Sequence, residues 1–230
     1  MEVGSNANYA DAMAEATPLY QVRLAIRRDL EDIAAGETVL VAASGGADSS
    51  ALAAALLSEA EERSIKVVAV IIDHSLQKNS ADVAQEAKKQ LTKIGYKNVE
   101  IRKIQVELKD GMEASARRAR YAALDEIAEI HKAAAIFLGH THDDQAETVL
   151  LGLARGSGTR SLSGMAPRMD KYRRPLLTIS RAMTEAACEE AGIKFWRDPH
   201  NQSMEYARVR VRDVVLPTME VEIGPGVADA

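Results

Sequence analysis

Apolar residues along the chain follow two alternating patterns. Short runs rich in β-branched residues predict strands at Thr38–Ala43, Lys66–Ile72, Val99–Val106 and Ala135–Gly139. Longer segments with apolar residues at helical spacing predict helices at Leu19–Ala34, Ala47–Glu62, Ala81–Ile94, Met112–Ala133, Asp143–Ala154 and Ser180–Gly192. Strands that alternate with helices in this way are typical of an α/β fold with a parallel sheet.

We expect a doubly wound parallel sheet of about five strands with helices on both faces, followed by a short, mainly helical C-terminal extension. We also expect residues 1–18 to form a polar leader, residues 19–217 the main domain, and residues 218–230 the start of a truncated helical region. Folds of this class bind ligands at the carboxyl ends of the strands, near the point where the strand order reverses.

The composition fits one domain with a full hydrophobic core and argues against a membrane protein. The 230 residues are 47% hydrophobic, and no apolar run approaches the ~20 residues of a membrane span. The first residues lack the basic and apolar regions of a signal peptide, so we expect a cytoplasmic protein. The single cysteine, Cys188, excludes a disulfide framework and fits a position in the core of a helix.

Charge is distributed unevenly along the chain. The formal net charge is -5, but the segment Arg155–Arg212 carries twelve Lys or Arg against six Asp or Glu, a local balance of +6 that leaves -11 elsewhere. A basic segment on an acidic body can bind a phosphate backbone locally. A solvated loop and helix face is the alternative interpretation.

The most informative motif is the loop that joins the first predicted strand to the next helix. Free backbone N–H groups at a helix N-terminus, next to glycines, bind oxyanions, so this loop predicts a phosphate site formed by Ser44, Gly45, Gly46, Ala47, Asp48 and Ser49. The lysine of a Walker A loop is missing. A carboxylate beside bound phosphates is best explained as a Mg²⁺ ligand, which assigns Asp48 to the metal. A Gly-Gly turn with a Ser/Asp helix cap is the alternative.

A second polar motif, GHTHDDQAET, starts at Gly139, where the fourth predicted strand ends. Asp144 as N-cap with Glu147 three residues later would form a capping box, which needs no chemistry. The same spacing places both carboxylates on one face of a helix aimed into the cleft, where they could hold a cationic substrate or a nucleophile. A metal site at His140 and His142 is less favoured, because alternate residues leave a strand in opposite directions.

Two groups of arginines are candidates for phosphate contacts. Arg117 and Arg120 share one helix face, although such a face is more often simply exposed. Near the C-terminus, Arg alternates with Val, which predicts an extended segment with three guanidiniums on one side: Arg208, Arg210 and Arg212. A salt-bridged edge strand is the alternative.

Taken in order, the motifs resemble those of the tRNA(Ile)-lysidine synthetases, members of the PP-loop ATP pyrophosphatases. The matching strings are SGGADSS, IIDHSL, EASARRARYAAL, GHTHDDQAET, LARGSG, RPLL, DPHN and the RxRxR–DVVLP ending, and they cover roughly Leu19 to Pro217. The chain departs from the family pattern at Thr141, where many members have a second histidine, and at Val209, where they have asparagine.

The resemblance implies an ATP- and Mg²⁺-dependent ligase that joins free L-lysine to the wobble cytidine of a tRNA(Ile) with a CAU anticodon, through an adenylated tRNA intermediate. It implies phosphates on Ser44–Ser49, adenine against Ile72 and Asp73, and Arg117 and His140 facing the nucleotide. Asp48, Asp144 and Glu147 would be catalytic, with Asp144 and Glu147 also orienting lysine or cytidine. The remaining substrate contacts, to the tRNA or the adenylate, would come from Arg208, Arg210 and Arg212. No membrane partner is expected, and the choice between monomer and homodimer stays open.

Three alternatives use the same loop. A tRNA 2-thiolation enzyme usually carries a CxxC pair or catalytic cysteines, which one cysteine argues against. An NAD synthetase does not explain the basic stretch after Arg155. A non-catalytic domain would bind ATP without turnover.

Overall fold

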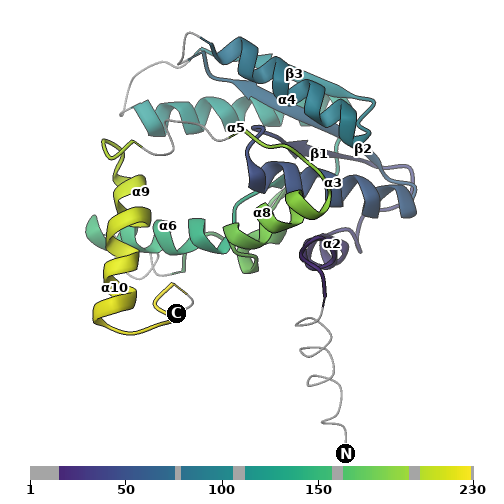
Figure 1. Ribbon diagram of the computed structural model, residues 1–230. Coiled ribbons are helices and arrows are strands. Elements are labelled where there is room, and N and C mark those ends of the chain that lie inside the picture. Colours follow the sequence, from purple (N-terminus) through teal and green to yellow (C-terminus); the bar gives the residue numbers. More distant parts are fainter. Residues whose placement is uncertain (1–15, 76–78, 106–111, 157–162, 197–202, 229–230) are drawn as a thin grey trace, which may run out of the picture.

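The protein is built around a six-stranded sheet with the order β3-β2-β1-β4-β6-β5. The computed structural model describes residues 16–75, 79–105, 112–156, 163–196 and 203–228, with only the backbone of residues 112 and 113. The strands are β1 (Thr38–Ala42), β2 (Lys66–Asp73), β3 (Val99–Lys103), β4 (Ala135–Leu138), β5 (Arg168–Met169) and β6 (Tyr172–Arg173). All neighbouring pairs are parallel except β5 with β6 (Figure 1).

The α/β class and the four longer strands are confirmed, but the strand number is six rather than about five. The additional pair, β5 and β6, is too short to leave a hydrophobic pattern in the sequence. Tyr172 and Arg173 are buried all the same, because β6 pairs with β4 and Arg173 forms an ion pair with Asp32, with Arg173 Nη2 2.8 Å from Asp32 Oδ2. The predicted end of the third strand at Val106 lies outside the described residues.

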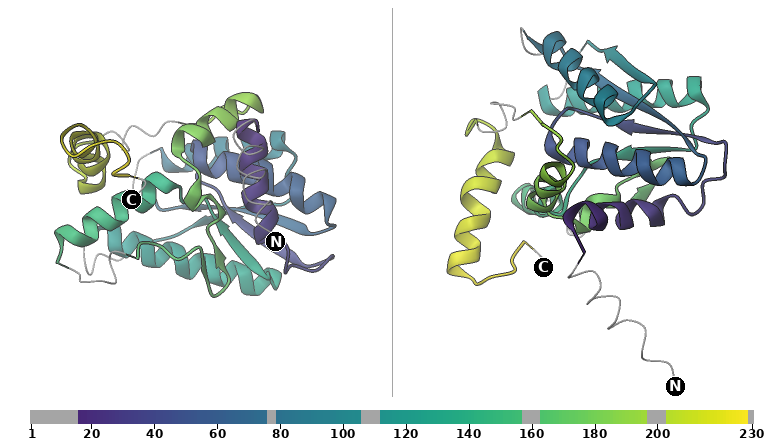
Figure 2. Two further views of the ribbon diagram at one scale, coloured as in Figure 1. Left: turned by 90° about the horizontal axis from the view of Figure 1, so that it is seen from below. Right: turned by 45° about the vertical axis from the view of Figure 1, so that its right-hand side comes forward.

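Helices cover both faces of the sheet, as expected (Figure 2). They are α2 (Pro18–Asp29), α3 (Ala47–Glu62), α4 (Ser80–Ile94), α5 (Met112–His131), α6 (His142–Ala154) and α8 (Arg181–Glu190), with a 3-10 turn at η1 (Pro175–Thr178). Thr17 caps α2 and Pro18 takes its first position, so the predicted boundary at residue 18 falls inside this helix.

Two hydrophobic clusters lie on opposite faces of the sheet. On one face, apolar side chains of α2, α3, α4 and α8 pack against β1, β2 and β4, with Leu52 and Phe137 fully buried. On the other face, Leu124 and Ile127 of α5 pack against Leu40 and Ile136. Burial on both faces explains why the central strands are almost continuously apolar.

The C-terminal part is helical where the sequence pattern predicted an extended segment. It consists of α9 (Ala207–Arg210), a π-helix η3 (Val211–Val215) and α10 (Leu216–Glu222), which follow one another directly and stand beside α6 (Figure 1). The prediction of an Arg/Val strand is therefore wrong. The predicted domain boundary at residues 217/218 falls within α10 and separates no two elements. In the described part of the chain, no helix is both long and apolar enough to cross a membrane.

Candidate functional site

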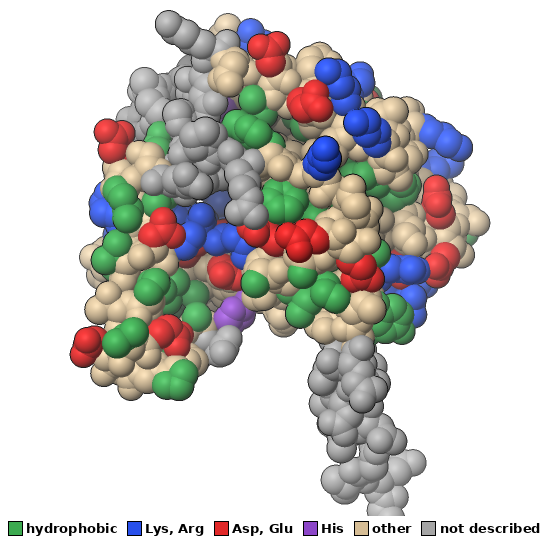
Figure 3. All heavy atoms as spheres, viewed as in Figure 1, with side chains coloured by type: hydrophobic (Ala, Val, Ile, Leu, Met, Phe, Trp, Pro, Cys, Tyr) green, Lys and Arg blue, Asp and Glu red, His purple; other side chains and the backbone are tan. Residues whose placement is uncertain are grey.

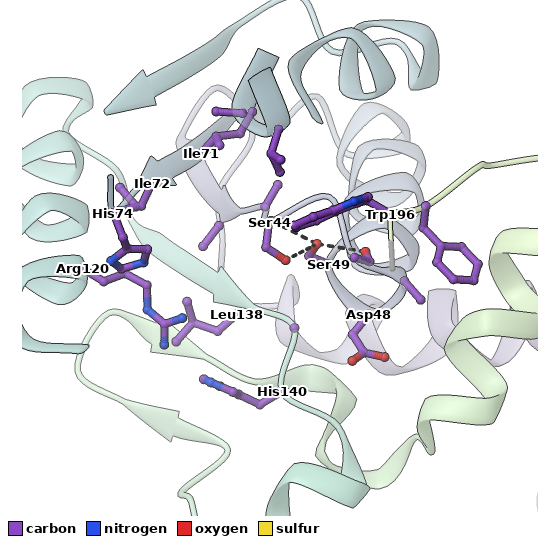
Figure 4. A pocket seen from close by; sticks show the side chains of 18 of the residues that line it. Ser44, Asp48, Ser49, Ile71, Ile72, His74, Arg120, Leu138, His140 and Trp196 are labelled. Carbon is purple, nitrogen blue, oxygen red and sulfur yellow. Dashed lines mark hydrogen bonds between the residues drawn. The ribbon is translucent and has the colours of Figure 1, made fainter. Parts of the chain in front are cut away.

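A cavity of about 900 Å³ opens at the carboxyl ends of β1, β2 and β4. Since β1 lies between β2 and β4, the strand order reverses there, and parallel sheets of this type bind ligands at that point. The lining includes most of the residues predicted for ATP: Ser44, Gly46, Ala47, Asp48, Ser49, Ile72, Asp73 and His140 (Figure 4).

The loop between β1 and α3 is held in an open shape by its own hydroxyls. Ser49 Oγ accepts a hydrogen bond from Ser44 N at 3.1 Å, lies 3.1 Å from Ser44 Oγ and donates to Gly46 O at 3.1 Å. Gly45 adopts a φ of +85°, which an L side chain rarely adopts, and Gly46 is the N-cap of α3. The first N–H groups of α3 lie beside the cavity, as an oxyanion site requires.

Gly139, directly after β4, permits a close approach to this loop. A Cβ atom at Gly139 would lie 3.2 Å from the backbone of Asp48 and Ser49. Backbone atoms cannot move aside as the end of a side chain can. Glycine here therefore allows the motif that follows β4 to lie directly against the N-terminus of α3.

The carboxylate of Asp48 is held by two residues of α8. Thr184 Oγ1 donates a hydrogen bond to Asp48 Oδ1, and Arg181 Nε lies 3.6 Å from Asp48 Oδ2. Burial raises the pKa of Asp48 to about 6, although the hydrogen bond from Thr184 and the charge of Arg181 act in the opposite direction. Bound Mg²⁺ would remove this cost of burying the charge, and Asp48 lines the cavity at the phosphate loop, so its position fits a metal ligand.

Asp144 and Glu147 form an acidic pair on α6 that is neutralised by three arginines. Arg212 Nε donates to Glu147 Oε1 at 2.6 Å, and Arg181 Nη2 donates to Asp144 Oδ1 at 3.2 Å. Arg208 lies 3.7 Å from both carboxylates, and Arg181 Nη1 lies 3.6 Å from Glu147. The side chain of Glu147 is 0% exposed. Glu147 Oε2 is buried without a hydrogen-bond partner, so one oxygen of this neutralised pair can accept a hydrogen bond from a bound substrate.

The capping box at the start of α6 differs from the predicted one. Thr141 is the N-cap and Asp144 is the third residue of the helix, with Thr141 N donating to Asp144 Oδ2 at 2.9 Å. The prediction of Asp144 as N-cap with Glu147 as its partner is wrong, because the N-cap lies three residues earlier, at Thr141. Asp144 therefore uses Oδ2 for the cap and Oδ1 for Arg181, while Glu147 has no capping role.

The opposite wall of the cavity is formed by His74, Arg120 and His140 (Figure 4). Burial lowers the pKa of His140 to about 3, with the charges of Arg120 and Arg174 acting in the same direction, so its imidazole is neutral near pH 7. Among the described residues, Nδ1 of His74 and Nδ1 of His140 are buried without a hydrogen-bond partner. Unpaired buried polar groups of this kind are suited to hydrogen bonds with a nucleotide base or ribose.

Arg117 and the C-terminal arginines lie differently from what the sequence suggested. Arg117 donates to Tyr121 OH at 3.2 Å and stacks on that ring, while Arg120 of the same helix lines the cavity. Arg212 also lines the cavity, whereas the exposed Arg210 donates to the backbone carbonyls of Met204 and Glu205. Arg208 and Arg212 share a face because they are one helical turn apart.

Several basic residues of Arg155–Arg212 form ion pairs with acidic residues of the same chain. Arg168 and Arg173 pair with Asp29 and Asp32 at the end of α2, and Lys171 pairs with Glu129. In the space-filling view, basic and acidic side chains also lie side by side in the hollow beside the C-terminal helices (Figure 3). Gly158, Arg160, Arg197 and the DPHN motif lie outside the described residues.

The sequence interpretation missed three residues of the site: Arg181, Thr184 and Trp196. Trp196 lines the cavity, and its backbone N–H donates to Gly45 O at 2.9 Å. No local motif signals these residues, because their partners are distant in the chain: Asp144 lies 37 positions from Arg181, and Asp48 lies 136 positions from Thr184. Within the described ranges, no group of three or more His, Cys, Asp or Glu side chains is arranged to hold a metal ion.

Comparisons with known proteins show the family of this chain. A family model described as a PP-loop domain matches residues 19–219. The chain is 48% identical over 213 residues to a tRNA(Ile)-lysidine synthase of Thermobifida fusca (strain YX), covering 93% of this chain and 66% of that protein. It is 50% identical to those of Leifsonia xyli subsp. xyli (strain CTCB07), over 86% of this chain and 60% of that one, and Streptomyces coelicolor (strain ATCC BAA-471 / A3(2) / M145), over 84% and 55%. The chain thus spans between about half and two thirds of these relatives' length.

A solved structure shares the fold. The U34-tRNA thiolase NcsA from Methanococcus maripaludis, with its [4Fe-4S] cluster, superposes with a TM-score of 0.73 at 18% identity, covering 92% of this chain and 76% of that one. At this identity the similarity concerns the fold alone.

Proposed function

Because this chain belongs to the PP-loop domain family, whose members bind ATP, we propose that it ligates L-lysine to C2 of the wobble cytidine of a tRNA(Ile) with a CAU anticodon, releasing AMP and pyrophosphate. The observation that carries the proposal is the acidic pair Asp144–Glu147 next to a phosphate-binding loop. The identity of 48 to 50% to tRNA(Ile)-lysidine synthases supports it.

In the first step, ATP binds with its phosphates on Ser44–Ser49 and its adenine against the end of β2 at Ile72 and Asp73. Asp48 would hold Mg²⁺, which neutralises the leaving pyrophosphate. The cytidine O2 attacks the α-phosphorus, and the bond to the β-phosphate oxygen breaks. His140 and Arg120 face the nucleotide from the other wall, and the neutral His140 contributes hydrogen bonds without adding charge.

In the second step, the ε-amine of lysine attacks C2 of the activated ring, and AMP leaves. A free lysine amine has a pKa of about 10.4, so it enters as an ammonium and must lose a proton before it attacks. Asp144 and Glu147 would orient this group through their carboxylate oxygens, and Glu147 Oε2, which is buried without a hydrogen-bond partner, can accept a hydrogen bond from it. For both steps the cytidine must be turned out of the anticodon loop, at an unstacking cost of a few kcal/mol.

The environment of the single cysteine, Cys188, does not support the alternative of a tRNA thiolase. Cys188 is buried in α8, its Sγ donates to Ala47 O at 3.4 Å, and burial raises the pKa of the thiol to about 12. A thiol in this environment is a poor nucleophile and a poor sulfur carrier.

An ATP–pyrophosphate exchange assay tests the first step. Exchange should require both Mg²⁺ and the tRNA with the CAU anticodon, because the nucleotide base is the attacking group. A matched tRNA(Met) with the same anticodon loop sequence but a different body serves as control for tRNA identity. Exchange that depends on lysine and not on tRNA would contradict the proposal, as would ATP binding without any exchange.

A further inference from the structure

Arg181, the first residue of α8, lies between the carboxylate of the phosphate loop and the two carboxylates of α6. Its guanidinium nitrogens are 3.2 Å from Asp144, 3.6 Å from Asp48 and 3.6 Å from Glu147. Three different nitrogens make these contacts: Nη2, Nε and Nη1 respectively. One side chain therefore contacts both the site proposed for Mg·ATP and the site proposed for the substrate cation.

The position of Arg181 is fixed from several sides. Its backbone N–H donates to Asp143 Oδ2 at 2.7 Å, and Ser180 caps the helix that it begins. The same helix packs against α2 and α3 in the hydrophobic core. Arg208 and Arg212, in contrast, come from the C-terminal helices beside α6, and Arg208 is at the longer distance of 3.7 Å from each carboxylate. Of the three guanidiniums, Arg181 is the one anchored in the body of the fold.

Thr184 extends this arrangement by one helical turn. Its hydroxyl donates to Asp48 Oδ1 and lies 2.8 Å from the backbone carbonyl of Arg181. Thr184 is 0% exposed, so this contact is made in the protein interior. Both residues reach the phosphate loop from the same face of α8, because they are three positions apart.

We infer that Arg181 is a positioning residue that holds Asp48 at a fixed separation from Asp144 and Glu147 and thereby aligns activation of the tRNA with attack by lysine. Three carboxylates this close to one another repel, and a planar guanidinium with its five N–H donors can neutralise and orient all three. A lysine at this position would carry the same charge but, as a single point, could not bridge the three groups. The inference rests on the proposed lysine ligation.

The test compares Arg181→Lys and Arg181→Gln with a matched control, Arg23→Lys. Arg23 also pairs with a buried glutamate, Glu59 at 2.8 Å, but lies on α2 and is not among the residues that line the cavity. For Arg181→Lys we expect kcat/KM for lysine to fall by about 100-fold, the size expected for a misplaced reacting group, while KM for ATP changes less than about threefold. Arg181→Gln should show an equal or larger loss, and Arg23→Lys should leave both parameters unchanged.

A merely structural role predicts a different result. It would lower the melting temperature of the Arg181 variants and reduce all their activities in proportion to the folded fraction. If Arg23→Lys lowered the melting temperature by the same amount, it would then lose the same activity. That outcome overturns the inference, as does a wild-type kcat/KM for lysine in both Arg181 variants.

A measurement without turnover separates this inference from the proposed function. If Arg181 orients Asp48, the changes in melting temperature caused by Arg181→Lys and Asp48→Asn should not add in the double variant, because the two groups interact. Absence of lysidine formation by the wild-type chain, together with this non-additivity, would refute the proposed function and leave the positioning intact. Additive shifts would refute the positioning.

Discussion

The charged carboxylate of Asp48 is buried at a cost in free energy, which is characteristic of a functional residue. Its carboxylate is largely buried, 22% exposed, and burial raises its pKa to about 6, compared with about 3.9 in an unfolded chain. Because the raised pKa means that the fold disfavours the charged form, the contribution of Asp48 to stability is fully present below about pH 4 and is lost as the pH rises through 6.

Replacing Asp48 by Asn should therefore stabilise the protein in the absence of Mg²⁺. At pH 7.5 the melting temperature of Asp48→Asn should exceed that of the wild type, and the difference should vanish near pH 4. Melting curves of both proteins, recorded across this pH range in EDTA, measure the difference. Added Mg·ATP should then stabilise the wild type and not the variant. A variant that melts lower than the wild type at pH 7.5 would refute the interpretation of Asp48 as a strained metal ligand.

Glu147 allows a second test, since a matched residue exists elsewhere in the fold. Glu147 and Glu59 are both 0% exposed and both pair with arginines. Changing either to Gln breaks a buried ion pair, which typically costs about 3 kcal/mol or more, so both variants should melt lower. Only Glu147→Gln should reduce lysidine formation, by orders of magnitude, in assays at a temperature where both variants are folded. Normal lysidine formation by Glu147→Gln would remove Glu147 from the site.

At the residue scale, the sequence predicts groups whose chemistry depends on local spacing. Ser44–Ser49 could be predicted because the glycines and the helix N-terminus are neighbours in the chain. Arg181 could not, because its partners Asp48, Asp144 and Glu147 come within reach only when α8 packs against α2 and α3 and its first residue contacts α6. The misplaced capping box has a local cause: Thr141 and Asp144 satisfy the same box rule as Asp144 and Glu147, and only the start of the helix decides between them.

At the scale of elements, long helices and central strands follow from their hydrophobic periodicity, while short polar segments do not. The Arg/Val alternation at positions 208 to 212 has a period of two, but Arg208 and Arg212 are also four apart and fit one face of a helix equally well. In so short a segment the packing decides, and pairing of both arginines with the acidic pair of α6 favours the helix.

The helical form assigns different roles to two neighbouring arginines. Arg212 points to Glu147 and the cavity, so Arg212→Ala should reduce lysidine turnover strongly and leave the salt dependence of tRNA binding unchanged. Arg210 is exposed, and if it contacts a tRNA phosphate, Arg210→Ala should lower the slope of log affinity against log salt by roughly 0.7 to 0.9. Binding titrations at several salt concentrations measure the slopes. A reversed pattern would mean that the helical segment is oriented differently towards the tRNA.

At the scale of the whole molecule, the arrangement of the sheet explains why distant motifs meet. The order β3-β2-β1-β4 brings the phosphate loop after β1, Asp73 at the end of β2 and the acidic motif after β4 to one edge. This convergence could be predicted from the alternation of strands and helices, because parallel strands end at the same edge. Two other features could not be predicted: the edge of the sheet at which β5 and β6 pair, and the position of the C-terminal helices beside α6. Both depend on contacts made by short segments.

The central claim is that one cavity performs both activation of a cytidine and its ligation to lysine. The most direct test is mass spectrometry of nucleosides from tRNA(Ile) transcripts with a CAU anticodon, incubated with excess protein, Mg·ATP and lysine at low salt. The account predicts lysidine at the wobble position, one AMP released for each lysine incorporated, and no product when Asp48→Ala replaces the wild type. A transcript that retains an unmodified cytidine while ATP binds normally, or that gains sulfur in the presence of a sulfur donor, would contradict it.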